Sequence, residues 1–361
     1  MNLYISAFLT ASILSFVLTP LAKKLAHKIG AIDVPKDDRR VHKTPIPRLG
    51  GLAIYLATFI TIFVFGLMGE VTMDSSIVAI FIGASIIVAM GMVDDTKPLS
   101  AKVKLLGQII AALVLVKGGI RIEVFSNPFI EGYNVTSLGV FSIPVTVIWI
   151  VGITNTLNLI DGLDGLAAGV GAIASLSLFF VAANFVNISP FYYVVMFIAV
   201  VLSGAAVGFL PYNFNPAKIF MGDTGSLFLG YMFAVLSVRG VMKGVTTLSF
   251  VLPIVILGLP IFDTAFAIVR RSLKGQPIMQ ADKGHVHHRF LRLGYTQKQT
   301  VLTMYLICVA LGMIAFLLSN MTSINYLKHL GYIGSIVFLL IAQISVSAGK
   351  KKKALQGEKD K

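Results

Sequence analysis

Long apolar runs, interrupted by Gly, Pro and charged residues, repeat along almost the whole of this 361-residue chain. Most of them approach the length of about 20 residues with which a helix crosses the hydrocarbon core of a bilayer. The segment 121–142 instead alternates apolar and polar residues around Gly and Asn, which favours a short hairpin. The pattern predicts eleven helices, at residues 3–22, 49–68, 76–93, 105–117, 143–159, 166–184, 191–210, 225–238, 246–269, 300–318 and 330–348.

Composition agrees with a membrane protein, because 56% of the residues are hydrophobic and only 13% are charged, against about 25% charged in ordinary soluble domains. We therefore expect an all-α integral membrane protein, a polytopic bundle of about eleven transmembrane helices. No polar stretch is long enough for a separate soluble domain, so residues 1–349 are predicted to form a single membrane domain. Residues 350–361 are expected to form a basic, disordered tail.

The basic residues give the bundle an orientation. If the N-terminus lies outside, the loops and the tail on the inner side hold all but five of the 30 Lys and Arg residues, as the positive-inside rule requires. The C-terminus is then cytoplasmic. The net charge of +14 is spread over short loops, which indicates contact with the headgroups of the lipid bilayer and argues against nucleic-acid binding.

Five aspartates stand where apolar runs stop, on the predicted cytoplasmic face. Asp94 and Asp95 are adjacent at the end of one run and are followed by basic residues that include Lys104. Neighbouring carboxylates raise each other's proton affinity, so a divalent cation or a reacting proton is a reasonable occupant. A solvated helix end with a charged stop signal is the alternative.

The segment NTLNLIDGLDG carries Asn158, Asp161 and Asp164, and the two aspartates share one side if the segment is helical. Its glycines would permit close approach of a ligand or a neighbouring helix. In MGDTGS, Asp223 precedes another apolar run. A helix that starts there would offer free N–H groups to a phosphate, and Asp223 could hold a metal that bridges it. The alternative in both segments is an ordinary helix cap.

The segment HVHHR contains His285, His287, His288 and Arg289. Imidazole and guanidinium groups suit diphosphate oxygens, whereas a zinc site would have to borrow carboxylates. A solvated basic loop is the other alternative. Upstream, the basic segment DVPKDDRRVHKTPIPRLGG, with Lys43 and Arg48, suits anionic headgroups or a nucleotide, although any inner loop would look similar. Asp263 is an intramembrane acid and hence a functional candidate, with pairing to a nearby arginine as the alternative.

Together these motifs resemble the polyprenyl-phosphate N-acetylhexosamine-1-phosphate transferases. The ordered set DD, NxxNxxDGxDG, MGDTGS and HxHHR carries the resemblance, which runs from Asp33 to about Arg292. HVHHR and eleven predicted spans are similar to the bacterial undecaprenyl-phosphate N-acetylglucosaminyl branch. The branch that transfers phospho-MurNAc-pentapeptide typically has an HHH-type loop and ten spans, and it is the alternative.

The resemblance implies a phospho-N-acetylhexosamine transferase in the bacterial cell membrane. Its substrates would be undecaprenyl phosphate and a UDP-sugar, UDP-GlcNAc in this branch, and its cofactor Mg²⁺, with Mn²⁺ left open. The reaction would release UMP and initiate a cell-envelope polysaccharide. By resemblance, Asp223 binds the metal with Asp94 and Asp95 close by, and Asp94 deprotonates or orients the lipid phosphate. The remaining implied site residues are Asp161 and Asp164 as catalytic groups, and Asn158, Lys104, Lys43, Arg48, His285, His287, His288 and Arg289 as substrate-binding groups.

Two rivals from other classes stay open at this point. A cation- or proton-coupled secondary transporter also uses intramembrane acids, but it predicts acids near the bilayer midplane. A non-catalytic lipid-binding scaffold would tolerate loss of Asp223. The sequence also leaves open a covalent aspartyl intermediate against direct attack, the polymer that the product feeds, and whether the protein forms a homodimer.

Overall fold

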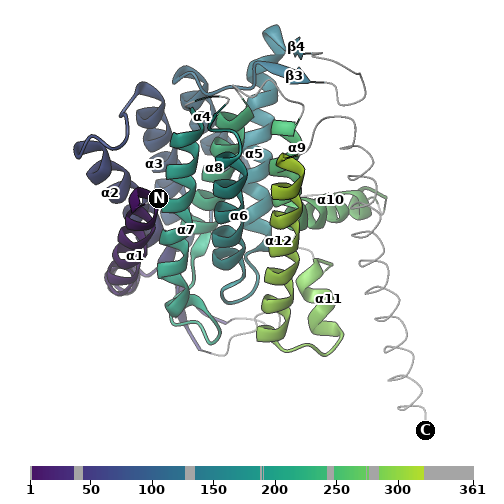
Figure 1. The fold of residues 1–361 in the computed structure, drawn as a ribbon. Helices are drawn as coiled ribbons and strands as arrows, with labels where there is room; N and C mark the ends of the chain where they lie inside the picture. Colours follow the sequence, from purple (N-terminus) through teal and green to yellow (C-terminus); the bar gives the residue numbers. More distant parts are fainter. Residues whose placement is uncertain are drawn as a thin grey trace.

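A computed structural model describes residues 2–35, 44–126, 135–187, 189, 191–241, 248–273, 275 and 284–320. In this part of the chain the fold is a helical bundle with two short antiparallel strand pairs (Figure 1). The strand pairs are β1 (Ile32–Asp33) with β2 (Ile46–Pro47), and β3 (Val124–Ser126) with β4 (Val135–Ser137). The helices are α1 (Asn2–Ile29), α2 (Gly50–Leu67), α3 (Ser75–Thr96), α4 (Ala101–Lys117), α5 (Ser142–Ile160), α6 (Leu166–Ala183), α7 (Phe191–Asn213), α8 (Gly222–Val241), α9 (Leu248–Ile256), α10 (Gly258–Leu273), α11 (Val286–Arg292) and α12 (Gln297–Ser319).

Most of the predicted helices are confirmed, as is the hairpin within 121–142, which is β3 and β4. The single helix predicted over 246–269 is wrong, because α9 ends at Ile256 and α10 begins at Gly258. Pro253, Gly258 and Pro260 explain the break, since proline removes a backbone donor and glycine lowers helix propensity. The short helix α11 was not predicted. The predicted helix 330–348, the tail and Lys43 lie outside the described residues.

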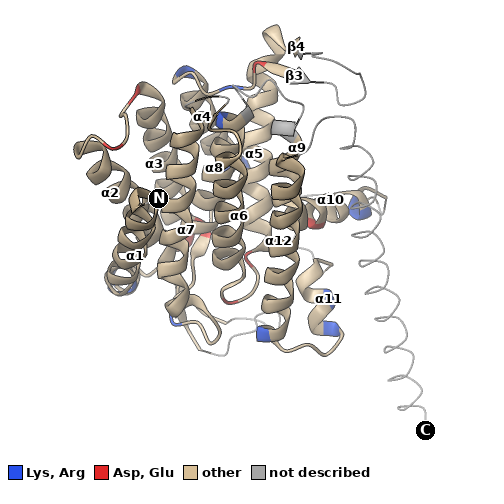
Figure 2. Cartoon of the chain, viewed as in Figure 1, with Lys and Arg blue, Asp and Glu red and all other residues tan. Residues whose placement is uncertain are grey.

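Seven helices in the described ranges are long and apolar enough to cross a membrane. These are α1, α2, α3, α5 with the preceding turn, α6, α7 and α12. The chain therefore has the architecture of a polytopic, largely helical membrane protein, while the number of eleven spans stays a prediction. Lys, Arg, Asp and Glu residues are sparse along the helices, and several of them lie at the two ends of the bundle (Figure 2).

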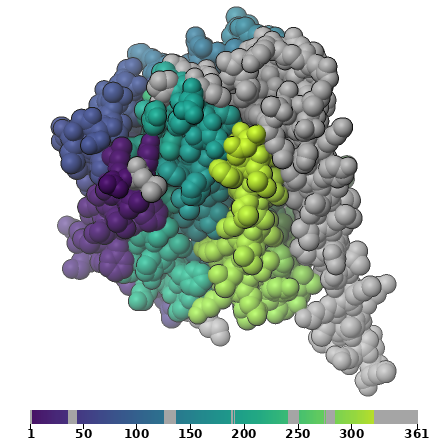
Figure 3. Space-filling model, viewed as in Figure 1, coloured from purple at the N-terminus to yellow at the C-terminus, as the bar shows by residue number. Residues whose placement is uncertain are grey.

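Helix α8 forms the centre of the bundle and packs against α2, α3 and α5. Its residues from Leu227 to Val238 are almost all buried, as expected of a helix that is apolar on every side. On the outside, α1 and α12 remain largely exposed (Figure 3). The outward residues of α1 are large and apolar, including Ile5, Leu9 and Ile13, which suits contact with lipid.

Glycine sets how closely the helices approach each other. A Cβ on Gly204 of α7 would lie 2.4 Å from the backbone oxygen of Phe8 in α1, and one on Gly208 would lie 2.1 Å from that of Ser12. Pairs of small residues four apart are typical of tight helix packing in membranes. Similarly, a Cβ on Gly91 of α3 would lie 2.5 Å from Cα of Thr224 in α8. The end of α3 is thereby held against the start of α8.

Candidate active site

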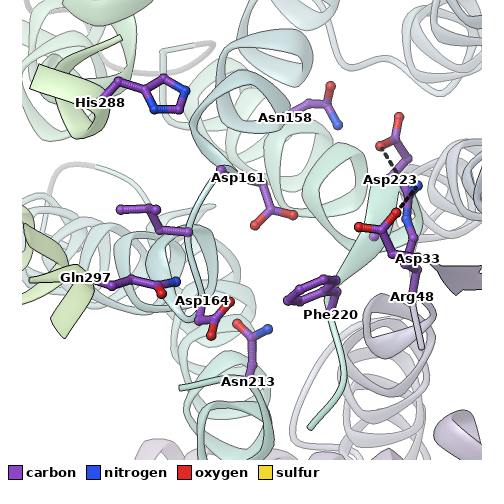
Figure 4. Close-up of a pocket in the computed structure, with 13 residues that line it drawn as sticks. Asp33, Arg48, Asn158, Asp161, Asp164, Asn213, Phe220, Asp223, His288 and Gln297 are labelled. Atoms are coloured by element: carbon purple, nitrogen blue, oxygen red, sulfur yellow. Dashed lines mark ion pairs between the residues drawn. The ribbon is translucent and has the colours of Figure 1, made fainter. Parts of the chain in front are cut away.

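The acidic motifs meet at one end of the bundle, where α3 and α5 end and α4, α6 and α8 begin. They surround a cavity of ≈ 380 Å³. Asp161 projects between two groups of side chains, with Asp33, Arg48 and Asp223 on one side and Asp164, Gln297 and His288 on the other (Figure 4). The residues that line the cavity are Asp33, Arg48, Asn158, Asp161, Gly162, Leu163, Asp164, Asn213, Phe220, Gly222, Asp223, His288 and Gln297.

Backbone pairing places Arg48 beside Asp223. The Phe220 N–H donates to the oxygen of Pro47 at 2.7 Å, and the Gly50 N–H donates to the oxygen of Phe220 at 2.9 Å. This joins the segment before α2 to the segment before α8. The side chain of Arg48 then forms ion pairs with Asp95 at 3.2 Å and with Asp223 at 3.7 Å.

The environment of Arg48 keeps it charged. Burial disfavours its cationic form, but the carboxylates of Asp95, Asp223 and Asp33 outweigh burial and raise the pKa of Arg48 above its usual range. Arg48 therefore offers a permanent positive charge at the cavity wall, and its role in binding substrate stays a prediction.

Asp95 anchors the start of α8. Its carboxylate accepts hydrogen bonds from the backbone N–H groups of Asp223 and Thr224, both at 3.0 Å, and from the Thr224 hydroxyl at 2.7 Å. An anion is stabilised there by the positive end of the helix. The expectation that these N–H groups are free for a phosphate is wrong, because the carboxylate of Asp95 already uses them, and its side chain is 0% exposed.

Asp94 and Asp223 are joined by a lysine. The ammonium of Lys104, on the first turn of α4, lies 2.8 Å from Oδ2 of Asp94 and 2.7 Å from Oδ2 of Asp223. The other oxygen of Asp94 accepts the Leu99 N–H at 2.7 Å. The predicted site residues Asp94, Lys104 and Asp223 are therefore in direct contact, although they come from three helices.

Among the five aspartates of the described motifs, Asp161 has the fewest partners. No described group donates a hydrogen bond to its side chain, which faces the cavity (Figure 4). Burial and the carboxylates of Asp223, Asp95 and Asp164, opposed by Arg48, raise the pKa of Asp161 to about 7. Asp161 is thus poised to change its protonation state or to accept a cation. Beside it, Asn158 donates to the Ser226 hydroxyl at 2.9 Å.

Asp164 is held by the loop before α8. Its Oδ2 accepts the Asn215 amide at 2.9 Å and the Ala217 N–H at 3.0 Å. Asn215 also donates to Gln297 at 2.8 Å. Asp161 and Asp164 do not lie on a helix, since α5 ends at Ile160 and α6 begins at Leu166, yet both line the cavity.

The histidines form a stack that leads to the cavity. The rings of His285 and His287 are parallel within 2°, with centroids 5.9 Å apart, and the rings of His287 and His288 are 4.3 Å apart. His288 lines the cavity, whereas His285 and His287 are buried. Burial and the nearby His288 lower the pKa of His287 to about 3, so that its ring is neutral at physiological pH.

The absence of a side chain at Gly162 leaves room for the histidine stack. A Cβ on Gly162, in the turn between α5 and α6, would lie 2.6 Å from Nε2 of His287. The expectation that the glycines of DGLDG permit close approach is therefore confirmed. Arg289 is directed elsewhere, since its Nε donates to the oxygen of Gly284 at 3.1 Å.

Sequence reasoning did not select several residues that line the cavity, among them Asn213, Phe220 and Gln297, and it included Asp33 only as part of the upstream basic segment. Asn213 accepts the Gly165 N–H and donates to the oxygen of Ile219, so it connects α6 to the segment before α8. A signal was present for two of them, because Asn213 and Phe220 lie in the polar stretch PYNFNPAKIFMGD that leads to Asp223. For Gln297 we find no signal in the sequence.

The donor set suits a divalent cation that brings other ligands with it. Among the residues that the structure describes, no three His, Cys, Asp or Glu side chains converge closely enough to form a metal site. Such a site is what structural zinc would need. Mg²⁺ is commonly held by one or two carboxylates together with water and substrate phosphates, and Asp161 and Asp223 both face the cavity. The metal roles of Asp223, Asp94 and Asp95 stay predictions.

Comparison with known proteins agrees with this arrangement. Residues 77–241 match the model of glycosyl transferase family 4. The chain is 44% identical over 317 residues to a Bacillus subtilis (strain 168) protein named "Probable undecaprenyl-phosphate N-acetylglucosaminyl 1-phosphate transferase". The match covers 88% of this chain and 85% of that protein.

Two further relatives have different names. The chain is 36% identical to the decaprenyl-phosphate N-acetylglucosaminephosphotransferase of Mycobacterium tuberculosis (strain ATCC 25618 / H37Rv), with 85% of this chain and 80% of that protein covered. It is 32% identical to the phospho-N-acetylmuramoyl-pentapeptide-transferase of Clostridium perfringens (strain SM101 / Type A), with 86% and 94% covered. Identity is thus higher to the two relatives named for N-acetylglucosamine.

Proposed function

This chain belongs to glycosyl transferase family 4, and on that basis we propose that it transfers N-acetylglucosamine 1-phosphate from UDP-GlcNAc to undecaprenyl phosphate. The reaction releases UMP and leaves a lipid-linked diphosphate sugar. The observation that carries this proposal is the 44% identity to the Bacillus subtilis relative over 88% of the chain. The phospho-MurNAc-pentapeptide alternative is less favoured, because identity to that relative is 32%.

The cavity has the charges that two phosphate substrates require. Lys104 and Arg48 both form ion pairs with Asp223. Phosphate oxygens of the substrates can replace Asp223 as the partner of these two side chains, because lysine and arginine both bind phosphate well. The cationic side chains then offset the repulsion between the two anions.

A divalent cation supplies Lewis-acid polarisation of the transferring phosphoryl group and neutralises charge there. Asp223, at the start of α8, and Asp161 are the side chains that would hold it from the cavity wall. Asp95 keeps the first turn of α8 in place and thereby positions Asp223. Asp94, which shares Lys104 with Asp223, is proposed to orient or deprotonate the lipid phosphate.

The opposite wall suits the nucleotide sugar. His288 lines it, and His285 and His287 lie behind His288 in the stack. Imidazole N–H groups can donate to diphosphate oxygens. Gln297 and Asn213 add neutral donors and acceptors on the same side.

The site is proposed to face the cytoplasm of a bacterial cell, with the N-terminus outside. Support comes from the positive-inside pattern of the sequence and from the position of the cavity at the end of the bundle where α11 and α12 begin. A UDP-sugar in the cytosol and a lipid phosphate in the inner leaflet would then meet at the cavity. The product would initiate a cell-envelope polysaccharide.

The decisive experiment supplies the purified full-length protein with undecaprenyl phosphate, Mg²⁺ and one UDP-sugar at a time, and measures UMP and the lipid-linked product. We expect UMP with UDP-GlcNAc and none with UDP-MurNAc-pentapeptide. Absence of UMP with every sugar would refute the proposed function. Preference for UDP-MurNAc-pentapeptide would assign the protein to the other branch.

A matched pair of variants tests the role of Asp223. Asp223→Asn should lower kcat/KM by about 100-fold or more, because a neutral amide cannot replace the charge that holds the cation. Glu123→Gln, an exposed acid near β3 that pairs with Arg121, should leave it unchanged. Full turnover of Asp223→Asn, or of the wild type after rigorous chelation, would contradict the metal assignment.

A further inference from the structure

Asp263 is a buried acid outside the cavity. It lies in α10 and is 6% exposed. The alternative reading of the sequence paired it with a neighbouring arginine, but both of its oxygens have other partners. Oδ2 lies 2.9 Å from Nδ1 of His285, and Oδ1 accepts the Val286 N–H at 2.9 Å.

These two contacts determine the chemistry of His285. An ionised carboxylate only accepts hydrogen bonds, so Nδ1 of His285 must carry the proton. Nε2 is then the ring nitrogen left for a ligand. The second contact holds the first backbone N–H of α11, where an anion is favoured by the helix dipole. One carboxylate thereby sets both the ring of His285 and the entry of the chain into α11.

The effect of Asp263 reaches the cavity through the histidine stack. The ring of His285 is parallel to that of His287, and His287 contacts His288, which lines the cavity. His287 lies against the turn that follows α5, where a Cβ on Gly162 would come within 2.6 Å of its Nε2. A shift of His285 or of the start of α11 would therefore displace His288.

We propose that Asp263 is a positioning residue of the active site, which sets the tautomer of His285 and places the histidine stack against the nucleotide sugar. The inference rests on the proposed function for its substrate. It explains why an ionisable side chain is kept inside α10, where burial of an unpaired carboxylate would cost free energy. It also gives a role to the break between α9 and α10, since a continuous helix would carry Asp263 elsewhere.

The first test reads the tautomer of His285 and does not depend on activity. Full-length protein in detergent is labelled with [¹⁵N]histidine, and the ring signals of His285 are identified by their loss in His285→Gln. We expect a protonated Nδ1 in the wild type and loss of that signature in Asp263→Asn. The control is Asp74→Asn, which also removes a helix-capping carboxylate paired with a side chain, here Arg239 at the other end of α8. Identical His285 signals in the wild type and Asp263→Asn would overturn the proposal.

The second test is kinetic. Asp263→Asn keeps an oxygen for Val286 and should lower kcat/KM for UDP-GlcNAc by about 10- to 100-fold, because a displacement of His288 of about 1 Å at the cavity wall would be costly. Combining it with His285→Gln should cost no more than the worse single change, because the two residues act as a unit. Asp263→Glu should recover part of the activity, and Asp74→Asn should retain all of it.

The outcomes separate this inference from the proposed function. If the wild type releases UMP and Asp263→Asn is equally active, the inference fails and the function stands. Additive losses in the double variant would also overturn it, since they would mean that Asp263 acts independently of His285. If the wild type releases no UMP, the function fails, and the tautomer of His285 decides the structural part of the inference.

Discussion

At the scale of the residue, five aspartates of the same chemistry have different environments. Both oxygens of Asp95 are committed to the start of α8, and Asp164 is held by the loop that contains Asn215. Asp94 and Asp223 share Lys104. Asp161 alone of the five has no recorded donor among the described residues. The sequence found all five, but only their partners separate structural acids from those that face the cavity.

The environment of Asp161 predicts a pH dependence. Its pKa of about 7 means that lowering the pH through 7 protonates it in the folded protein. If its ionised form holds the divalent cation, protons and Mg²⁺ compete for Asp161. At subsaturating Mg²⁺, kcat/KM should therefore rise with pH between about 6 and 8, and saturating Mg²⁺ should move this rise to lower pH. The measurement is the initial rate of UMP release over that pH range. A second enzyme that uses the same UDP-sugar is assayed in parallel as a control for ionisation of the substrate. An Asp161→Asn variant with residual activity should lack this fall in kcat/KM at acid pH. The same fall in the variant and the wild type would contradict the assignment to Asp161.

The same shift affects stability with a definite sign. The pKa of Asp161 is raised from 3.8 to about 7 on folding, so the folded protein holds a proton that the unfolded chain releases. The contribution of Asp161 to stability is therefore fully present below about pH 4 and is lost as the pH rises through about 7. In the absence of divalent cations, the melting temperature of Asp161→Asn should exceed that of the wild type by a larger margin at pH 8 than at pH 6. Equal differences at both pH values would refute this.

Gly162 shows what a single absent side chain permits. A Cβ there would lie 2.6 Å from Nε2 of His287, so Gly162→Ala should displace the histidine stack. We expect kcat/KM for UDP-GlcNAc to fall by about 10-fold or more, because small misplacements in an active site are costly. Steady-state kinetics provide the measurement. Unchanged kinetics would mean that His287 can move without affecting the site.

At the scale of the element, contacts between helix ends build the site. Gly91 brings the end of α3 to the backbone of Thr224, and Gly51 brings the start of α2 to the backbone of Gly225, where a Cβ would lie 2.1 Å from its Cα. These approaches carry Asp95 and Arg48 to the first turn of α8. The hydrophobic pattern predicted the helices but not these approaches, because a glycine in an apolar run looks like any other small residue.

The approach of α3 to α8 predicts the effect of a methyl group. Gly91→Ala should destabilise the protein by about 1–3 kcal/mol, since overpacking forces helices apart. Gly152→Ala in α5 is the matched control, because no atom lies within 4 Å of the added Cβ and alanine has the higher helix propensity. Melting temperatures in detergent should therefore fall for the first variant and not for the second. Equal melting temperatures would show that α3 and α8 can relax.

At the scale of the whole molecule, the bundle gathers the motifs at one end and leaves other charges at the opposite end. Arg239 and Asp74 form an ion pair at 3.3 Å there, and Arg121 pairs with Glu123 near β3. The cavity and the acidic motifs therefore lie at one end of the bundle, and these two ion pairs lie at the other. The proposal that the cavity faces the cytoplasm can be tested on the whole protein in its membrane.

Labelling of intact cells tests the orientation. A membrane-impermeant maleimide should react with Glu123→Cys and should not react with Lys298→Cys, an exposed position at the start of α12, until the membrane is opened. Cys308 is the single native cysteine and is buried, so background labelling should be low. The reverse pattern would place the cavity outside and remove the cytoplasmic site.

The sequence by itself determined that this chain is a helical membrane protein, where most of its helices lie and which acidic and histidine motifs interrupt its apolar runs. Periodic hydrophobicity and rare charges are local properties, and the bilayer makes their cost high, so they are readable without a fold. The tertiary structure alone decided that Asp95 anchors α8, that the predicted helix 246–269 is broken, and that Asp263 supports His285. These facts depend on which helix ends meet, and such contacts between residues far apart in the chain leave no periodic signal in the sequence.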